Sequence, residues 1–128
     1  MSTPEAAVAV RSLYDRLGGR VGIAAIVDDI IAAHIANPLV GERFKAIQDI
    51  DHAKRMACDF FCMGAGGPQK YAGKDMRTAH EGMGVTEREF DAVVDDIVSV
   101  LRAHAIDDTT RREVLAILTG FKGEIVHQ

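Results

Sequence analysis

The chain has 128 residues, a formal net charge of −4 at pH 7 and 48% hydrophobic residues. This length and composition fit one soluble domain with a core of its own. The negative charge, and the lack of any run of five basic residues, argue against binding to a nucleic-acid backbone. No apolar run approaches the length of a membrane span and the start lacks a signal-peptide pattern, so we expect a cytoplasmic protein.

The first predicted helix begins near Ser2 and runs to about Leu17. Ser2-Thr3-Pro4-Glu5 provides a hydroxyl cap, a proline at the first helical position and an acid in the first turn. Gly18-Gly19 then ends the helix. We expect residues 1–11 to form an N-terminal extension, helical or frayed, and residues 12–128 to form the main domain.

The next two predicted helices cover residues 21–36 and 39–44. The first carries one continuous stripe of residues spaced by three and four, and Asn37-Pro38 ends it. The stripe consists of Ile23, Ile26, Val27, Ile30, Ile31 and His34. The second helix is short, and we expect Phe44 to point inward.

Asp49 or Asp51 can cap the helix that follows. Its inward face, again at helical spacing, is predicted to be Ala53, Met56, Ala57, Phe60, Phe61 and Gly64. Cys58 and Cys62 lie four residues apart on this helix, where disulfide geometry is poor, and two cysteines alone do not make a zinc site. We interpret them as reduced packing residues, with a redox role as the alternative.

Two long helices are predicted in the last third of the chain. Thr86-Glu87-Arg88-Glu89 is a capping box. The helix it opens carries Phe90, Val93, Val94, Ile97 and Leu101 on one side. Asp107-Asp108-Thr109 caps the last helix, whose inward residues are predicted to be Val114, Leu115, Leu118, Phe121 and Ile125. No segment alternates with a period of two, so the predicted fold class is all-α.

Residues 66–84, which read GGPQKYAGKDMRTAHEGMG, contain His80 one helical turn after Met76. Glycine and proline at residues 66–68, and glycines 82 and 84, interrupt the chain on both sides. Neutral imidazole binds iron through one nitrogen, while the other donates to a nearby carbonyl and fixes the ring. A lone histidine is more often a core or surface residue, so the interpretation depends on the surrounding pattern.

Several motifs occur in a fixed order over about residues 12–126. They are Leu13-Tyr14-Asp15-Arg16-Leu17-Gly18-Gly19, Val27-Asp28-Asp29, Asn37-Pro38 with Phe44, Phe60-Phe61 before the GGP at 66–68, the Ala79-His80 pair with Gly82, and Phe90 with Val93. This order resembles the first group of the truncated haemoglobins. The resemblance implies the truncated globin fold, a two-over-two helical sandwich around haem b, with His80 as the proximal iron ligand.

A haem needs an apolar slot between helices, with cations where its propionates emerge. The candidates for the walls of the slot are Phe44, Met56, Phe60, Phe61, Met76, Phe90 and Val93. The candidates near the propionates are Lys54, Arg55, Lys70, Lys74, Arg77 and the hydroxyl of Tyr71. For any single one of these cations, a solvated surface charge is the commoner role.

The positions that hold oxygen-binding donors in typical members are apolar in this sequence. The resemblance places Ile31 where those proteins have a distal tyrosine, and Ala53 and Ala57 where glutamine is common. A hydroxyl or amide donor stabilises negative charge on the bound ligand, and none of these three side chains can donate.

Three interpretations of the distal side remain open. The pocket is apolar and open, or Met56 (or His52, after a shift of helix register) occupies the sixth position of the iron, or His34 supplies a donor from deeper in the pocket. Core packing is the commoner role for Met56, and a buried neutral imidazole is the commoner one for His34.

We expect a haem protein that reversibly binds oxygen, carbon monoxide or nitric oxide. The resemblance implies roles in oxygen handling or transport, nitric oxide detoxification or ligand sensing. Nitric oxide dioxygenation also needs an electron donor, here an unidentified reductase, and the missing distal donors disfavour it, so the enzyme question stays open. The alternative is a six-coordinate haem protein for electron transfer or redox and gas sensing, and a haem-free interaction protein is a third possibility. We expect a monomer or a weak dimer.

Overall fold

The computed structural model describes residues 11–128, which contain helices and no β-strand. The helices are α2 (Leu13–Arg16), α3 (Gly19–Ala36), α4 (Gly41–Lys45), α5 (Ile50–Gly64), α6 (Met76–His80), α7 (Glu87–Ala103), α8 (Asp108–Gly120) and α9 (Lys122–Ile125). The predicted start of the first helix at Ser2 lies outside the described residues. Within them, Ser12 caps α2 by accepting from the backbone N–H of Asp15 at 3.1 Å.

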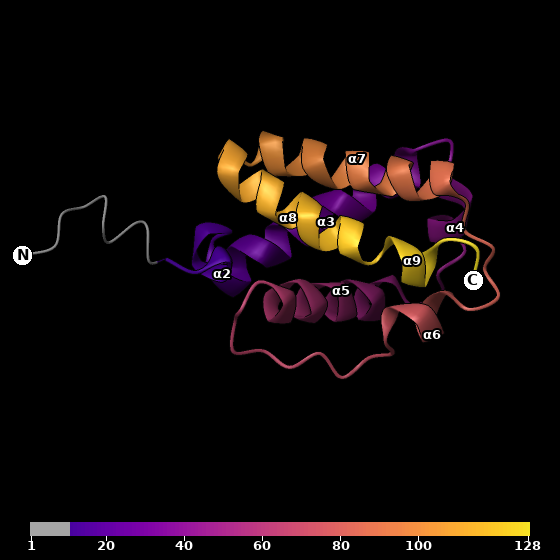
Figure 1. The fold of residues 1–128 in the computed structure, drawn as a ribbon, viewed down its shortest axis with the longest axis horizontal. Coiled ribbons are helices and arrows are strands. Elements are labelled where there is room, and N and C mark those ends of the chain that lie inside the picture. Colours follow the sequence, from indigo (N-terminus) through magenta and orange to yellow (C-terminus); the bar gives the residue numbers. More distant parts are fainter. Residues whose placement is uncertain (1–10) are drawn as a thin grey trace, which may run out of the picture.

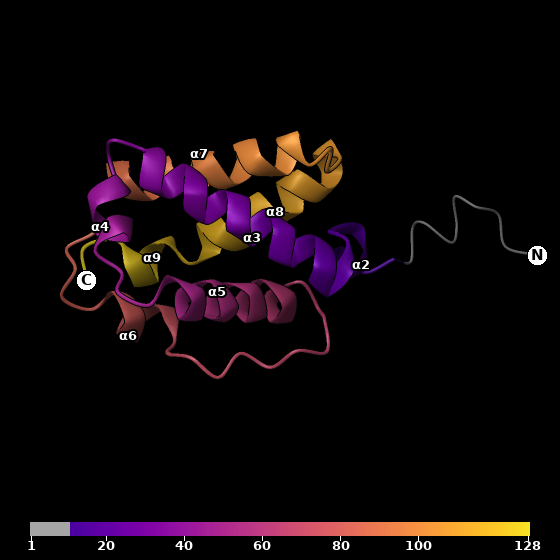
Figure 2. The same ribbon diagram turned by 180° about the vertical axis from the view of Figure 1, so that it is seen from behind.

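Two pairs of long helices form the body of the domain. Helix α3 packs against α5, and α7 packs against both α3 and α8. The short helices α4, α6 and α9 gather with the C-terminus at one end, and α2 lies at the other (Figures 1 and 2). Between residues 11 and 128, no helix is both long enough and apolar enough to cross a membrane.

Helix α3 is the centre of the core. Its buried residues are Ile23, Ile26, Val27, Ile30, Ile31 and His34, which confirms the predicted stripe. The helix begins two residues earlier than predicted, after Gly18, whose φ of +97° favours glycine. A Cβ on Gly22 would lie 2.5 Å from the carbonyl oxygen of Leu17, so a glycine is also required where α2 and α3 meet.

Helix α5 places its two cysteines against the core. Cys58 and Cys62 are buried free thiols that pack in the same cluster as the α3 stripe, in agreement with a packing role. Burial is the main cause that raises the pKa of Cys62 to about 11, which disfavours a reactive thiolate. The prediction of an inward Gly64 was wrong, since Gly64 is exposed, while Cys62 and Ala65 beside it are buried in the core.

Helix α7 begins with the predicted capping box. The backbone N–H of Glu89 donates to Thr86 Oγ1 at 3.1 Å, and the N–H of Thr86 donates to Glu89 Oε1 at 3.2 Å. Its buried residues are Phe90, Ala92, Val94, Ile97, Val100 and Leu101, while Val93 is half-buried. The predicted apolar face of α7 is therefore confirmed, except that the side chain of Val93 is only half-buried.

Helix α8 differs from the prediction in two ways. Leu115 is 39% exposed, whereas Thr110, which the apolar pattern could not indicate, is fully buried and hydrogen-bonded to Asp107 at 2.6 Å. The helix also ends at Gly120 instead of continuing to Ile125, and α9 follows as a separate turn. Glycine is a poor helix former, and the hydroxyl of Thr119 donates to the carbonyl of Leu115 at 2.8 Å, a bond that bends helices.

Candidate functional site

His80 lies at the wall of an apolar cavity of about 280 Å³. Helices α4 to α9 and the segments between them enclose this cavity, which is thus built from nearly the whole chain after α3. The lining residues are Val40, Arg43, Phe44, Ile47, Phe60, Met76, His80, Met83, Val85, Glu89, Phe90, Val93, Val94, Ile97, Leu118, Phe121 and Ile125.

The imidazole of His80 is fixed by its own helix. Its Nδ1 lies 2.8 Å from the carbonyl oxygen of Met76, one turn earlier on α6. A carbonyl can only accept, so in the neutral ring Nδ1 carries the hydrogen and Nε2 has the lone pair. A half-buried imidazole with one anchored nitrogen and one free lone pair beside an apolar cavity is suited to bind a metal.

The C-terminal residues hold α6 in place. Arg77 Nη1 donates to Gln128 Oε1 at 3.0 Å, and the backbone N–H of His127 donates to the carbonyl of Val85 at 2.8 Å. Helix α6 also packs against α9. No local pattern indicates this support, because the first bond joins residues that are 51 positions apart and the second also joins distant parts of the chain.

The structure brings six of the predicted residues to the same cavity. They are Phe44, Phe60, Met76, His80, Phe90 and Val93. Phe60 packs against Phe121, with ring centroids 5.5 Å apart, and against Tyr71 at 5.1 Å. Aromatic side chains from α4, α5 and α7 therefore converge on the cavity that His80 faces.

The predicted propionate cations do not line this cavity. Lys54 Nζ forms an ion pair with Asp28 at 2.9 Å, and Lys70 and Lys74 are exposed. The hydroxyl of Tyr71 donates to the carbonyl of Lys74 at 2.6 Å, which closes a turn before α6. Arg55 is also exposed.

The remaining apolar candidates lie on α3 and α5. Ile31 is part of the main core, and Ala57 packs against that core. Ala53 and Met56 are half-buried and lie outside the cavity lining. Phe61 lines a second apolar cavity of about 240 Å³, between α2, α5 and α8.

His34 faces helix α7. Its Nδ1 lies 2.8 Å from Asp96 Oδ2, and the same carboxylate accepts from Asn37 Nδ2 at 3.1 and 3.2 Å. The His34 ring also packs against Phe44, with ring centroids 4.6 Å apart. Burial is the main cause that lowers the pKa of His34, and the bond to Asp96 opposes it. His34 is therefore a buried neutral imidazole that does not line the cavity but packs against Phe44, which does.

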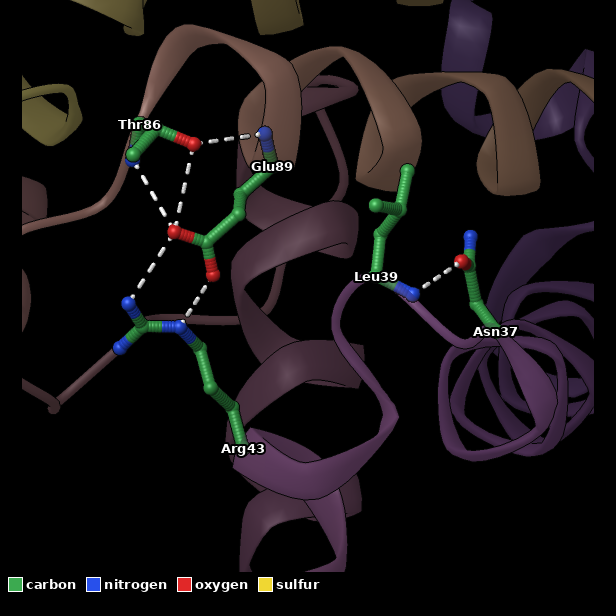
Figure 3. Close-up of polar contacts among 5 residues, drawn as sticks. All are labelled: Asn37, Leu39, Arg43, Thr86 and Glu89. Carbon is green, nitrogen blue, oxygen red and sulfur yellow. Dashed lines mark hydrogen bonds and ion pairs between the residues drawn. The ribbon is translucent and has the colours of Figure 1, made fainter.

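An ion pair that sequence reasoning missed lies on the cavity wall. Arg43 donates to Glu89 through two nitrogens, with Nε–Oε2 at 2.5 Å and Nη2–Oε1 at 3.1 Å (Figure 3). The bond to Arg43 is the main cause that lowers the pKa of Glu89. Glu89 is also the capping-box residue of α7, so its carboxylate connects the start of α7 to α4. The two residues are 46 positions apart, and no local pattern links them.

These features fit an iron porphyrin. A porphyrin is a wide apolar slab that needs apolar side chains on both faces and an axial nitrogen. The cavity supplies aromatic and aliphatic walls, and His80 supplies an anchored imidazole with a free lone pair.

Comparisons with known proteins point to the same fold. Residues 12–127 match the bacterial-like globin family. The group 1 truncated hemoglobin of Tetrahymena pyriformis is 31% identical over 108 residues, which is 84% of this chain and 88% of that protein. The group 1 truncated hemoglobin GlbN of Mycolicibacterium paratuberculosis is 27% identical over 114 residues, or 89% of this chain and 83% of that protein.

Solved structures agree with these sequence matches. The crystal structure of the Tetrahymena pyriformis truncated hemoglobin in its Fe(III) form has a TM-score of 0.88 at 28% identity and covers 92% of this chain and 100% of that chain. The 2/2 hemoglobin of a Synechococcus species, in the cyanomet state with covalently attached heme, has a TM-score of 0.84 at 27% identity with the same coverage. The all-α two-over-two fold expected from the sequence is confirmed, and this chain belongs to the bacterial-like globins and, among them, to the group I truncated haemoglobins.

Proposed function

We propose that this protein binds haem b through Nε2 of His80 and reversibly binds oxygen, carbon monoxide or nitric oxide. Membership of the truncated haemoglobins implies haem and diatomic gas ligands. The observation that carries the proposal is the 2.8 Å contact between His80 Nδ1 and the Met76 carbonyl, which leaves Nε2 free beside the apolar cavity. The haem would supply an iron with one coordination position for the gas.

The side chains around the cavity have separate tasks in this proposal. Phe44, Phe60 and Phe90 pack on the porphyrin and exclude water, and Met76 and Val93 fill the space near its edge. Met56 and Phe61, which lie outside the present lining, are proposed as peripheral contacts on α5. Excluding water stabilises a buried apolar group and protects it from side reactions.

The exposed segment between α5 and α6 offers polar groups for the propionates. We propose Lys70 and Lys74 of this segment and Arg77 of α6 as candidate partners, together with the hydroxyl of Tyr71, which would exchange its bond to the Lys74 carbonyl for one to a propionate. Exposed ion pairs of this kind contribute little, about 0–1 kcal/mol each. Apolar contacts and the bond to His80 would therefore supply most of the affinity.

The distal side is proposed to bind its ligand without a strong hydrogen-bond donor. Ile31, Ala53 and Ala57 cannot donate, His34 uses its Nδ1–H on Asp96, and Arg43 on the cavity wall donates to Glu89. Such a pocket discriminates weakly between polar and apolar diatomic ligands. Such a pocket disfavours efficient nitric oxide dioxygenation. That reaction would also require an electron-donating partner.

A visible absorption spectrum of the purified protein tests the proposal. We expect a Soret band, a five-coordinate ferrous form, and a shifted spectrum when carbon monoxide is added. A six-coordinate low-spin ferrous spectrum without added ligand would place a side chain such as Met56 on the iron and favour the electron-transfer or sensing alternative. The absence of a Soret band after reconstitution with haem would refute haem binding.

A further inference from the structure

Two carboxylates on one face of α7 bind residues next to Phe44: Glu89 binds Arg43, the neighbour of Phe44 in the chain, and Asp96 binds His34, whose ring packs against Phe44. Glu89 and Asp96 lie seven residues apart, so they point in nearly the same direction from the helix. We propose that Glu89 and Asp96 are positioning residues that set the place of the Phe44 ring in the His80 cavity. The proposal rests on the haem function proposed above, because Phe44 is taken as a haem contact.

The first contact, between Arg43 and Glu89, acts through the backbone of α4. Both side chains are largely covered, with exposed fractions of 33% and 17%. The planar guanidinium matches the carboxylate with two bonds, which fixes orientation as well as distance. Thr86 holds the same carboxylate from the other side (Figure 3). Since Arg43 directly precedes Phe44, the pair fixes the turn of α4 that carries the ring.

The second contact acts on the ring itself. Asp96 accepts from His34 and from Asn37, so three hydrogen bonds hold one carboxylate against the end of α3. His34 is 3% exposed and lies against Phe44, with an angle of 35° between the rings. Phe44 lines the cavity and His34 does not, so the Phe44 ring has the cavity on one side and the fixed imidazole on another.

Between these two contacts, the surface is hollow. A groove of about 560 Å³ lies between α7 and the segment that joins α3 to α4. Its walls include Leu39 and Asp95. The N–H of Leu39 donates to Asn37 Oδ1 at 3.0 Å (Figure 3). Beside this groove the segment keeps one buried apolar residue, Val40, so the two polar contacts act together with apolar packing to set its place against α7.

Haem release to an acceptor globin tests the proposal on the haem-loaded protein. Glu89→Gln and Asp96→Asn each replace a charged acceptor by a neutral amide, and we expect each to speed haem release by about tenfold. Glu87→Gln and Asp95→Asn are matched controls, because these exposed carboxylates lie on the same helix, and their release rates should stay unchanged.

The background of Phe44→Leu separates positioning from general support of the fold. If the carboxylates act through Phe44, then Glu89→Gln and Asp96→Asn should add little to the release rate of Phe44→Leu. Urea unfolding of each variant measures its loss of stability. We expect such a loss whether the carboxylates position Phe44 or only support the fold. Additive effects on release would overturn the proposal and leave a purely structural role.

NMR of the protein as purified tests the positioning of Phe44 independently of whether His80 binds haem. We expect a proton contact between the His34 and Phe44 rings, weakened in both variants and retained in both controls. If the protein takes up no haem, the proposed function fails, and the ring contact still decides whether the carboxylates position Phe44. A contact of unchanged strength in both variants would overturn the inference even if haem binds.

Discussion

Acidification should destabilise the fold through His34. The neutral ring is buried, and burial is the main cause that lowers its pKa from the ordinary value of 6.5. Between the lowered pKa and 6.5, the unfolded chain binds more protons than the folded one, so stability rises with pH in this window. The contribution is therefore complete above about pH 6.5 and is lost as the pH falls towards the lowered value.

The free energy of unfolding can change by at most about 1.4 kcal/mol per pH unit through this group, because His34 binds one proton. The Asp96 carboxylate reduces this slope, because it would pair with a protonated ring at 2.8 Å. His34→Gln keeps a donor for Asp96 and removes the titration. We expect the variant to be less stable at neutral pH by about 1 kcal/mol, since it loses the ring contact with Phe44, and we expect the gap to shrink on acidification.

Urea unfolding of the parent and His34→Gln, from about pH 8 to about pH 5, measures this difference. Subtracting the free energy of unfolding of His34→Gln from that of the parent at each pH cancels the contributions of the other four histidines. These contributions include any release of a metal by His80. A gap that widens on acidification would show that pairing with Asp96 outweighs burial and would refute the reasoning. A constant gap would show that His34 does not titrate in this range.

Three further predictions concern the haem. His80→Gly should lose most of the haem, and added imidazole should restore it, as followed by the Soret band; an unchanged spectrum would mean another ligand. Ile31→Tyr should slow oxygen release by roughly tenfold to a hundredfold and carbon monoxide release much less, by stopped flow, since a hydrogen bond to a charged acceptor contributes about 1.5–3 kcal/mol. Slow oxygen release before the substitution would reveal a donor that Ile31, Ala53 and Ala57 do not provide. Lys70→Gln or Lys74→Gln should raise the haem release rate only slightly, and no change in either would show that the propionates are held elsewhere.

Local patterns predicted the parts of this fold that depend on local physics. The α3 stripe was readable because one helix face is buried along its whole length. The capping box at Thr86 was readable because its two bonds join residues three positions apart. The segment around His80 stood out because glycines and a proline isolate it, and the structure places it beside a cavity.

Contacts between residues that are distant in the sequence could not be predicted from local patterns. Asp96 and His34 are 62 positions apart, and the sequence around either residue does not indicate the other as its partner. Leu115 is 39% exposed for a related reason, since the apolar pattern of α8 does not show which of its apolar residues other helices cover. The end of α8 at Gly120 has a local contribution from the glycine, but which face of the helix is covered depends on tertiary packing.

The distribution of polar groups around the cavity bears on how the protein selects a ligand. Burying a polar group costs free energy unless its hydrogen bonds are satisfied, and His34 and Asp96 meet this condition outside the lining of the cavity. If ligand choice depends on cavity shape, a variant of Asp96 should change oxygen and carbon monoxide release by similar factors. A donor at position 31 should instead change oxygen release selectively, because it interacts with charge on the ligand. The ratio of the two rates therefore distinguishes control by shape from control by hydrogen bonding.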